Sequence, residues 1–244
     1  MANEMCSSGT YWGKWKQYLK PHVCKPFIII YVFNLMQLVC GTSTFVFYLP
    51  FIFLSGNIDG LFGIIFVVIL ILMVRFVFMF VSCVILLCVG RRLICVSSGV
   101  GSGITAILIG TFVYMKTIDK WILLGFVLLN LAFNSCGLLF MPTTMIGEIL
   151  PSNIRCVVGA YIFAINNIVR LLAINYYHSV FTAVDIHGLF WIFGVCSLLC
   201  SLFLYLMLPE TKGRSLVQIE EYFLQPNVLW LTRKKCQNIR NTNI

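Results

Sequence analysis

Two arginines, Arg75 and Arg170, lie in the middle of long apolar stretches of the sequence. An arginine at the centre of a bilayer costs at least about 2.5–3.5 kcal/mol, so each side chain must face a bundle interior or water. None of the apolar stretches contains an acidic residue that could pair with them. We therefore expect both guanidinium groups to need a wet cavity, backbone carbonyl groups or an anionic ligand.

Uncharged polar and small residues share one helical face in two other apolar stretches, each of which also contains a proline. The first group is Asn34, Gln37, Gly41, Thr44 and Tyr48, with Pro50 following, and the second is Asn130, Asn134 and Gly137, with Pro142 following. Such residues also let helices pack closely and hydrogen-bond to each other. Because two interrupted segments recur three helices apart, we favour a solute cavity lined by the first and fourth spans. Asn166, one turn before Arg170, extends the same wall.

The elements that must position these residues are six apolar stretches, at about 27–54, 61–89, 93–115, 121–146, 156–181 and 188–208. Each reaches the roughly 20 residues that cross a bilayer. With 60% hydrophobic and only 10% charged residues, the chain has too little polar surface for a soluble globule. The sequence predicts an all-α integral membrane protein, with the lipid bilayer as its solvent. Residues 26–208 form the six-helix domain, between a segment at 1–25 without a signal-peptide core and a basic tail at 209–244.

The distribution of charge predicts the orientation of the spans. Four of the 17 lysines and arginines are Arg75, Arg170, Lys116 and Lys120, and the other thirteen all fall on one side of the predicted topology. Positive charge collects in cytoplasmic loops, so both termini are expected in the cytoplasm. This pattern accounts for the net charge of +9 without nucleic acid.

Other classes of chemistry find little support in the sequence. It has no G-x-S-x-G, H-E-x-x-H or P-loop motif, so no enzyme activity, catalytic residue or cofactor is expected. The eleven cysteines fall within spans or on the predicted cytosolic side, which argues against a disulfide framework. Cys196 and Cys200 lie one turn apart with no second pair nearby, and we interpret them as packing residues and not as metal ligands.

Three short loops resemble signatures of the sugar porter family of the major facilitator superfamily. They are GEILPSNIR after the fourth span, PETKGRSL after the sixth and GRR after the second, and the resemblance extends from about residue 20 to 223. In appearance the chain is nearest to the insect facilitated trehalose transporter group. The resemblance implies that the six spans form the C-terminal half, a 3+3 inverted repeat, of a twelve-helix fold.

The polar faces, the buried arginines and the resemblance together predict two sets of functional residues. The substrate-binding set is Gln37, Gly41, Ser43, Arg75, Asn134, Thr143, Asn166 and Arg170. The cytosolic gate set is Arg91, Arg92, Glu148, Arg155, Glu210 and Arg214. Opposite charges at helix ends can lock the inner side and release it as the helices rock. For Arg91 and Arg92, a role in topology alone is an equally open interpretation.

Several sugar-reading positions depart from the family pattern. Gln37, Gly41 and Asn166 are kept, but Arg75 and Arg170 replace neutral polar residues, and Thr143 stands where the family has tryptophan. We expect facilitated sugar transport by alternating access in the plasma membrane, with an N-terminal half or a second copy as partner. The alternatives are a diverged or truncated paralogue that transports nothing, acting as a sensor or interaction partner or reflecting an incomplete gene model, and an organic-anion carrier that uses Arg75 and Arg170.

Overall fold

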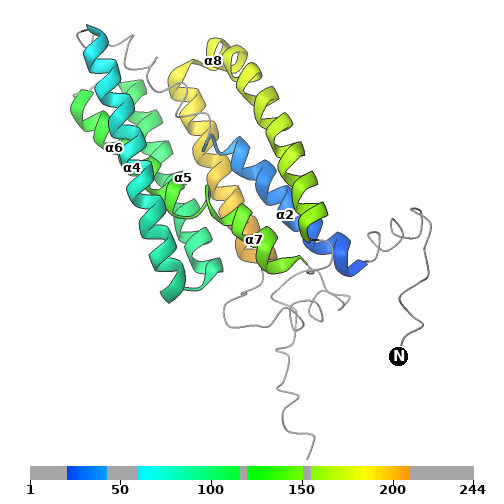
Figure 1. The fold of residues 1–244 in the computed structure, drawn as a ribbon. Helices are drawn as coiled ribbons and strands as arrows, with labels where there is room; N and C mark the ends of the chain where they lie inside the picture. Colours follow the sequence, from blue (N-terminus) through cyan, green and yellow to red (C-terminus); the bar gives the residue numbers. More distant parts are fainter. Residues whose placement is uncertain (1–20, 43–59, 116–119, 151–154, 209–244) are drawn as a thin grey trace, which may run out of the picture.

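The computed structural model describes residues 21–42, 60–115, 120–150 and 155–208, and these residues are helices joined by short turns. The helices are α2 (Pro21–Val39), α4 (Gly60–Cys88), α5 (Arg91–Met115), α6 (Lys120–Cys136), α7 (Met141–Ile149) and α8 (Arg155–Met207). As Figure 1 shows, α4 and α6 lie side by side at one side of the bundle, and α2 lies against α8 at the other. α5 packs against both α6 and α8, which makes it the central helix.

Five segments are long and apolar enough to cross a membrane. They are Ile65–Cys88, Arg91–Met115, Trp121–Ile149, Arg155–Tyr176 and Val184–Met207, with a shorter apolar helix at Pro26–Val39. The five correspond to the second to sixth expected spans, and the shorter helix begins the first. The expected continuation of the first span to residue 54 lies outside the described residues, as do residues 1–20 and 209–244. Helix α2 begins at Pro21, before the expected boundary at 26, because proline is well suited to a first helical turn.

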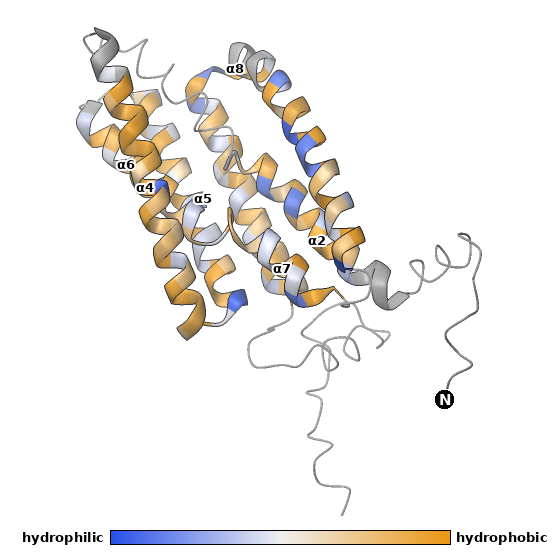
Figure 2. Ribbon diagram, viewed as in Figure 1, coloured by the Kyte–Doolittle hydropathy of each residue, from blue (hydrophilic) through white to orange (hydrophobic). Residues whose placement is uncertain are grey.

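Helix α4 shows how strongly the membrane determines these elements. Its sequence is almost wholly apolar (Figure 2), and side chains such as Phe76 and Phe80 are 71% and 68% exposed on the outside of the bundle. In lipid, a segment can satisfy its backbone polar groups only within itself, and the α-helix does this. Arg75 is the single charged residue of this helix.

The first span is interrupted where α2 ends. Gly41 adopts a positive φ of 76°, which only glycine accepts at low cost. A Cβ atom at this position would also lie 2.9 Å from the ring of Phe193 in α8. Gly41 is therefore required both by the backbone turn and by the close approach of α8.

The fourth span is interrupted between α6 and α7, at residues 137–140. The hydroxyl of Ser98, in α5, spans the break: it donates to the carbonyl of Phe133 (2.7 Å) and accepts from the amide of Leu138 (3.1 Å). Gly137 leaves room for this contact, because a Cβ there would lie 2.5 Å from the Ser98 Cβ. The helix resumes as α7 with Pro142 in its first turn. The sequence-based expectation that the fourth span is interrupted is thus confirmed, and in the first span the described residues end in the turn at residues 40–42.

Helix α8 contains the fifth and sixth spans. They join at Asp185, whose backbone leaves the helical conformation (φ 61°, ψ 171°). Next to this turn, the His187 ring lies 5.6 Å from Trp191 and 5.4 Å from Tyr114, centroid to centroid. Aromatic residues of this kind are typical of a membrane–water boundary.

Asp185 divides α8 into a first arm, before it, and a second arm, after it. Small residues allow α5 and the second arm of α8 to pack closely. The Ser201 hydroxyl donates to the Val96 carbonyl (2.9 Å), and a Cβ on Gly99 would lie 2.9 Å from the Ser201 Cβ. Further along, a Cβ on Gly194 would meet the Gly103 carbonyl oxygen at 3.0 Å. Small residues spaced four apart give membrane helices this kind of close contact.

Gly194→Ala should destabilise the bundle by about 1–3 kcal/mol, because the new methyl group would meet backbone atoms of α5 that cannot move independently. Gly125→Ala is the matched control, since a Cβ there meets nothing within 4 Å. Unfolding of both variants by SDS in mixed micelles measures the difference. Equal stability would mean that α5 and α8 are not in close contact at Gly194.

Candidate functional site

Polar side chains from α2, α4 and the first arm of α8 gather in the middle of the bundle. Asn34 and Gln37 of α2 are buried, as is Asn166 of α8, while Arg75 and Arg170 are half-buried. Figure 2 shows hydrophilic positions on α2 and on the first arm of α8, among otherwise apolar helices. Of the substrate-binding residues expected from the sequence, Gln37, Arg75, Asn166 and Arg170 belong to this group. Ser43 lies outside the described residues.

Gln37 connects the two interrupted spans. Its Nε2 donates to the carbonyl oxygen of Leu139 at 3.2 Å, and Leu139 belongs to the break between α6 and α7. A carbonyl at a helix break lacks its usual intrahelical donor, so a glutamine amide is a suitable partner. One wall of the site thus consists of two helix breaks held together by a side-chain amide.

Arg75 reaches the break in the first span. Its Nη2 donates to the carbonyl of Thr42 at 2.8 Å, and the Thr42 hydroxyl donates to the carbonyl of Gln37 at 2.7 Å. Thr42 is a site residue that the sequence reading missed, although its place directly after Gly41 in an interrupted span could have indicated it. The contact anchors the guanidinium group toward the bundle interior and away from lipid.

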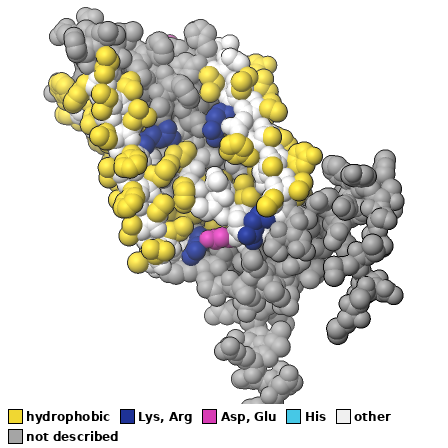
Figure 3. All heavy atoms as spheres, in the orientation of Figure 1, with side chains coloured by type: hydrophobic (Ala, Val, Ile, Leu, Met, Phe, Trp, Pro, Cys, Tyr) yellow, Lys and Arg dark blue, Asp and Glu magenta, His cyan; other side chains and the backbone are white. Residues whose placement is uncertain are grey.

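Asn166 and Arg170 present unused hydrogen-bonding atoms on the first arm of α8. Within the described part of the chain, Asn166 Oδ1 and Arg170 Nε are buried and have no hydrogen-bond partner. Arg75 and Arg170 are also close enough to interact electrostatically. Figure 3 shows basic groups on either side of the central part of one face, at mid-height. The site therefore offers a buried acceptor and a buried donor one helical turn apart.

Asn134 and Thr143 have different surroundings. Asn134 donates to the carbonyl and to Oδ1 of Asn130, and Asn130 donates to Ser102 and Thr105 of α5. These hydrogen bonds place Asn134 in the packing network between α5 and α6. Thr143 is exposed on the first turn of α7. Polar packing networks of this kind are the ordinary role of amides between membrane helices.

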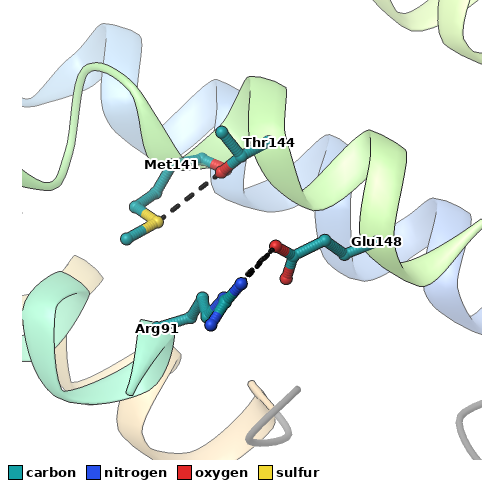
Figure 4. A network of polar contacts seen from close by, with 4 residues as sticks. All are labelled: Arg91, Met141, Thr144 and Glu148. Atoms are coloured by element: carbon teal, nitrogen blue, oxygen red, sulfur yellow. Dashed lines mark hydrogen bonds and ion pairs between the residues drawn. The ribbon is translucent and has the colours of Figure 1, made fainter. Parts of the chain in front are cut away.

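A second group of charges lies at the ends of α5, α7 and α8. Nε and Nη2 of Arg91 lie 3.2 and 3.1 Å from Glu148 Oε1, in a part-buried ion pair (Figure 4). Arg92 stacks over the Tyr205 ring at 4.5 Å and donates to the Tyr205 carbonyl. Arg155 donates to the Leu150 carbonyl at 3.2 Å. We call Arg91, Arg92, Glu148 and Arg155 the end cluster. Glu210 and Arg214 lie outside the described residues.

The described residues include no group of three or more histidine, cysteine or acidic side chains that could hold a metal ion. Cys40 and Cys200 are both buried, within an apolar cluster that includes Ile94 and Leu204. Their surroundings are those of packing residues. What the site can do is bind a solute through amide, carbonyl and guanidinium groups.

Comparison with known proteins identifies relatives of the chain. The family model described as "Sugar (and other) transporter" matches residues 1–223. The chain is 31% identical over 205 residues to the facilitated trehalose transporter Tret1 of Anopheles gambiae, covering 80% of this chain and 25% of that protein. It is 30% identical over 205 residues to Tret1 of Polypedilum vanderplanki, covering 80% of this chain and 40% of that protein. The chain thus spans between a quarter and two fifths of the length of these relatives.

Solved structures agree on the fold. The proton:xylose symporter XylE, bound to 6-bromo-6-deoxy-D-glucose, superposes with a TM-score of 0.71 at 21% identity, covering 81% of this chain and 42% of XylE. The inward-open XylE of E. coli gives a TM-score of 0.66 at 22% identity, covering 86% of this chain and 44% of XylE. The chain belongs to the family of sugar and other transporters, and its membrane helices form one half of a major facilitator fold.

Proposed function

We propose that this chain is the C-terminal half of a carrier that moves a sugar across a membrane by alternating access. The observation that carries the proposal is the Gln37–Leu139 hydrogen bond, which joins two interrupted spans beside the unpartnered Asn166 Oδ1. Interrupted helices at corresponding places of a repeat line the solute sites of secondary transporters. The names of its relatives, trehalose transporters and a xylose symporter, support a sugar as the solute.

The residues of the site would bind the solute without converting it chemically. Sugar hydroxyls both donate and accept, so they suit the Asn166 carbonyl oxygen and the amides and guanidinium groups nearby. Gly41 and Ser43 would lie along the interrupted first span, and Thr143 and Asn134 along the fourth. The set has more donors than acceptors, because Arg75 and Arg170 only donate.

The end cluster would act as the gate on the cytoplasmic side. The Arg91–Glu148 pair holds the start of α5 against the end of α7, and α7 follows one of the two breaks. A part-buried ion pair is strong enough to favour one state and weak enough to open. Arg92, Arg155, Glu210 and Arg214 would complete this gate.

A complete solute pathway in this fold lies between two halves. We therefore propose that the six-helix unit works with an N-terminal half or with a second copy of itself. The excess of positive charge at the ends supports a cytoplasmic location for both termini, and the plasma membrane is the proposed location. In the bilayer, the exposed apolar side chains of α4 would face lipid or the partner.

Asn166→Ala should reduce saturable uptake of trehalose or glucose by about two- to ten-fold, the effect of one lost hydrogen bond. Uptake of radiolabelled sugar is measured in oocytes injected with the native transcript that encodes the chain, with surface expression quantified. Asn167→Ala is the control, because Asn167 is exposed and its amide donates to Phe163 of its own helix. Wild-type uptake no greater than in uninjected oocytes would favour a paralogue that does not transport.

Glu148→Arg should abolish the ion pair and raise the fraction of molecules open to the cytoplasm, because like charges would then meet at the end cluster. The double exchange Arg91→Glu with Glu148→Arg should restore most of the wild-type behaviour. Accessibility of a cysteine placed at Thr143 to a thiol reagent added from the cytoplasmic side measures the shift. If the double variant is as open as the single one, the pair is not the gate.

A further inference from the structure

Arg75 and Arg170 lie at the same depth in the bundle. At about 1.5 Å per residue, Arg75 is about 20 Å from the end of α4 at Cys88, and Arg170 about 22 Å from the start of α8 at Arg155. These two helix ends lie at the same end of the bundle, because the Arg91–Glu148 pair and the Arg155–Leu150 contact both lie there. With a hydrocarbon layer about 30 Å thick, both cations are deep in the membrane.

The chain supplies little to neutralise this pair of cations. All eight acidic residues of the sequence fall outside the six apolar stretches. Arg75 has the Thr42 carbonyl as a neutral partner, and Arg170 Nε is buried with no partner among the described residues. The two guanidinium groups also repel each other. Two like charges close together in a low-dielectric site favour a negative charge between them.

A neutral sugar satisfies this requirement poorly. Hydrogen bonds between a guanidinium group and an oxyanion are roughly twice as strong as those between neutral groups, and arginine can bind carboxylate or phosphate through two parallel bonds. The neighbouring Asn166 Oδ1 needs a donor, which an oxyanion lacks and a hydroxyl group has. One wall of the site therefore calls for an anionic group and, one helical turn away, a hydroxyl group.

We propose that the solute of this site is an anionic sugar, whose carboxylate or phosphate is held between Arg75 and Arg170 while an adjacent hydroxyl donates to Asn166. The inference rests on the proposed function, of which it names the substrate class. It also explains why Arg75 and Arg170 stand where the family has neutral polar residues, although the loop signatures of the family are kept. A carboxylate side chain from another part of the transporter is the competing source of negative charge.

Thermal stabilisation of the purified protein, produced from its native transcript, tests the proposal. The probes are glucuronate, glucose 6-phosphate, glucose and inorganic phosphate, at constant ionic strength. We expect glucuronate or glucose 6-phosphate to bind at least ten-fold more tightly than glucose and more tightly than inorganic phosphate, and the comparison of the two shows which oxyanion is preferred. No preference for either sugar anion over glucose overturns the proposal and points to a protein carboxylate as the partner.

Variants assign the binding to the named residues. Arg75→Gln and Arg170→Gln should each weaken sugar-anion binding at least ten-fold, and Arg75→Lys and Arg170→Lys less so, because lysine keeps the charge but loses the bidentate geometry. Asn166→Ala should weaken glucuronate binding and leave inorganic phosphate binding unchanged. Lys235→Gln, after the last span in the sequence, controls for net charge. Unchanged affinity in both glutamine variants overturns the proposal, and the melting temperatures without ligand show whether the variants fold.

Uptake in oocytes separates this proposal from the function on which it rests. Saturable uptake of glucose or trehalose without inhibition by either sugar anion would support the transport function and overturn the anionic substrate. Binding of a sugar anion that depends on both arginines, without uptake of any sugar, would support the site and overturn the transport function. Uptake of a labelled sugar anion that is lost in both glutamine variants would support both.

Discussion

The structure depends on how backbone groups are satisfied where membrane helices break. A bilayer has no water to bond with a carbonyl or an amide released from a helix, so a neighbouring side chain must do so. Ser98 hydrogen-bonds to backbone groups on both sides of the break between α6 and α7. Arg75 donates to the carbonyl of Thr42, and Gln37 donates to the carbonyl of Leu139. Two of these three side chains also belong to the candidate solute site. In the proposed site, Arg75 and Gln37 would therefore both hold the backbone and contact the solute.

Some aspects of the structure could be predicted from the sequence. A span must be long and apolar, which is the strongest signal a sequence carries, and the second to sixth spans were located within a few residues. Glycine and proline marked the interrupted spans, and the structure has a turn at Gly41 and a break between α6 and α7. The depth of Arg75 and Arg170 likewise followed from counting residues along an apolar helix.

Partners across helices could not be predicted, because they depend on how the helices pack. Nothing in the sequence connects Ser98 with Leu138, and the carboxylate that Arg91 meets is defined only when α5 and α7 come together. Asn134 shares a helical face with Asn130, and the structure shows that this face hydrogen-bonds along α6 and to α5. The face of a helix can be read from spacing, but the neighbour of that face cannot.

The turn at Asp185 is a candidate hinge between the two arms of α8. Asp185 is the residue at which α8 leaves the helical conformation, so a rotation of the arm that carries Arg170 would be centred there. The second arm packs closely against α5 at Gly194 and Ser201, so the first arm would be the one that moves. A swing of about 5° would move Arg170, about 22 Å from the turn, by about 2 Å, and the far end at Arg155 by about 4 Å. The displacement at Arg155 would therefore be about twice that at Arg170, so this end of the bundle would open more than the level of the arginine.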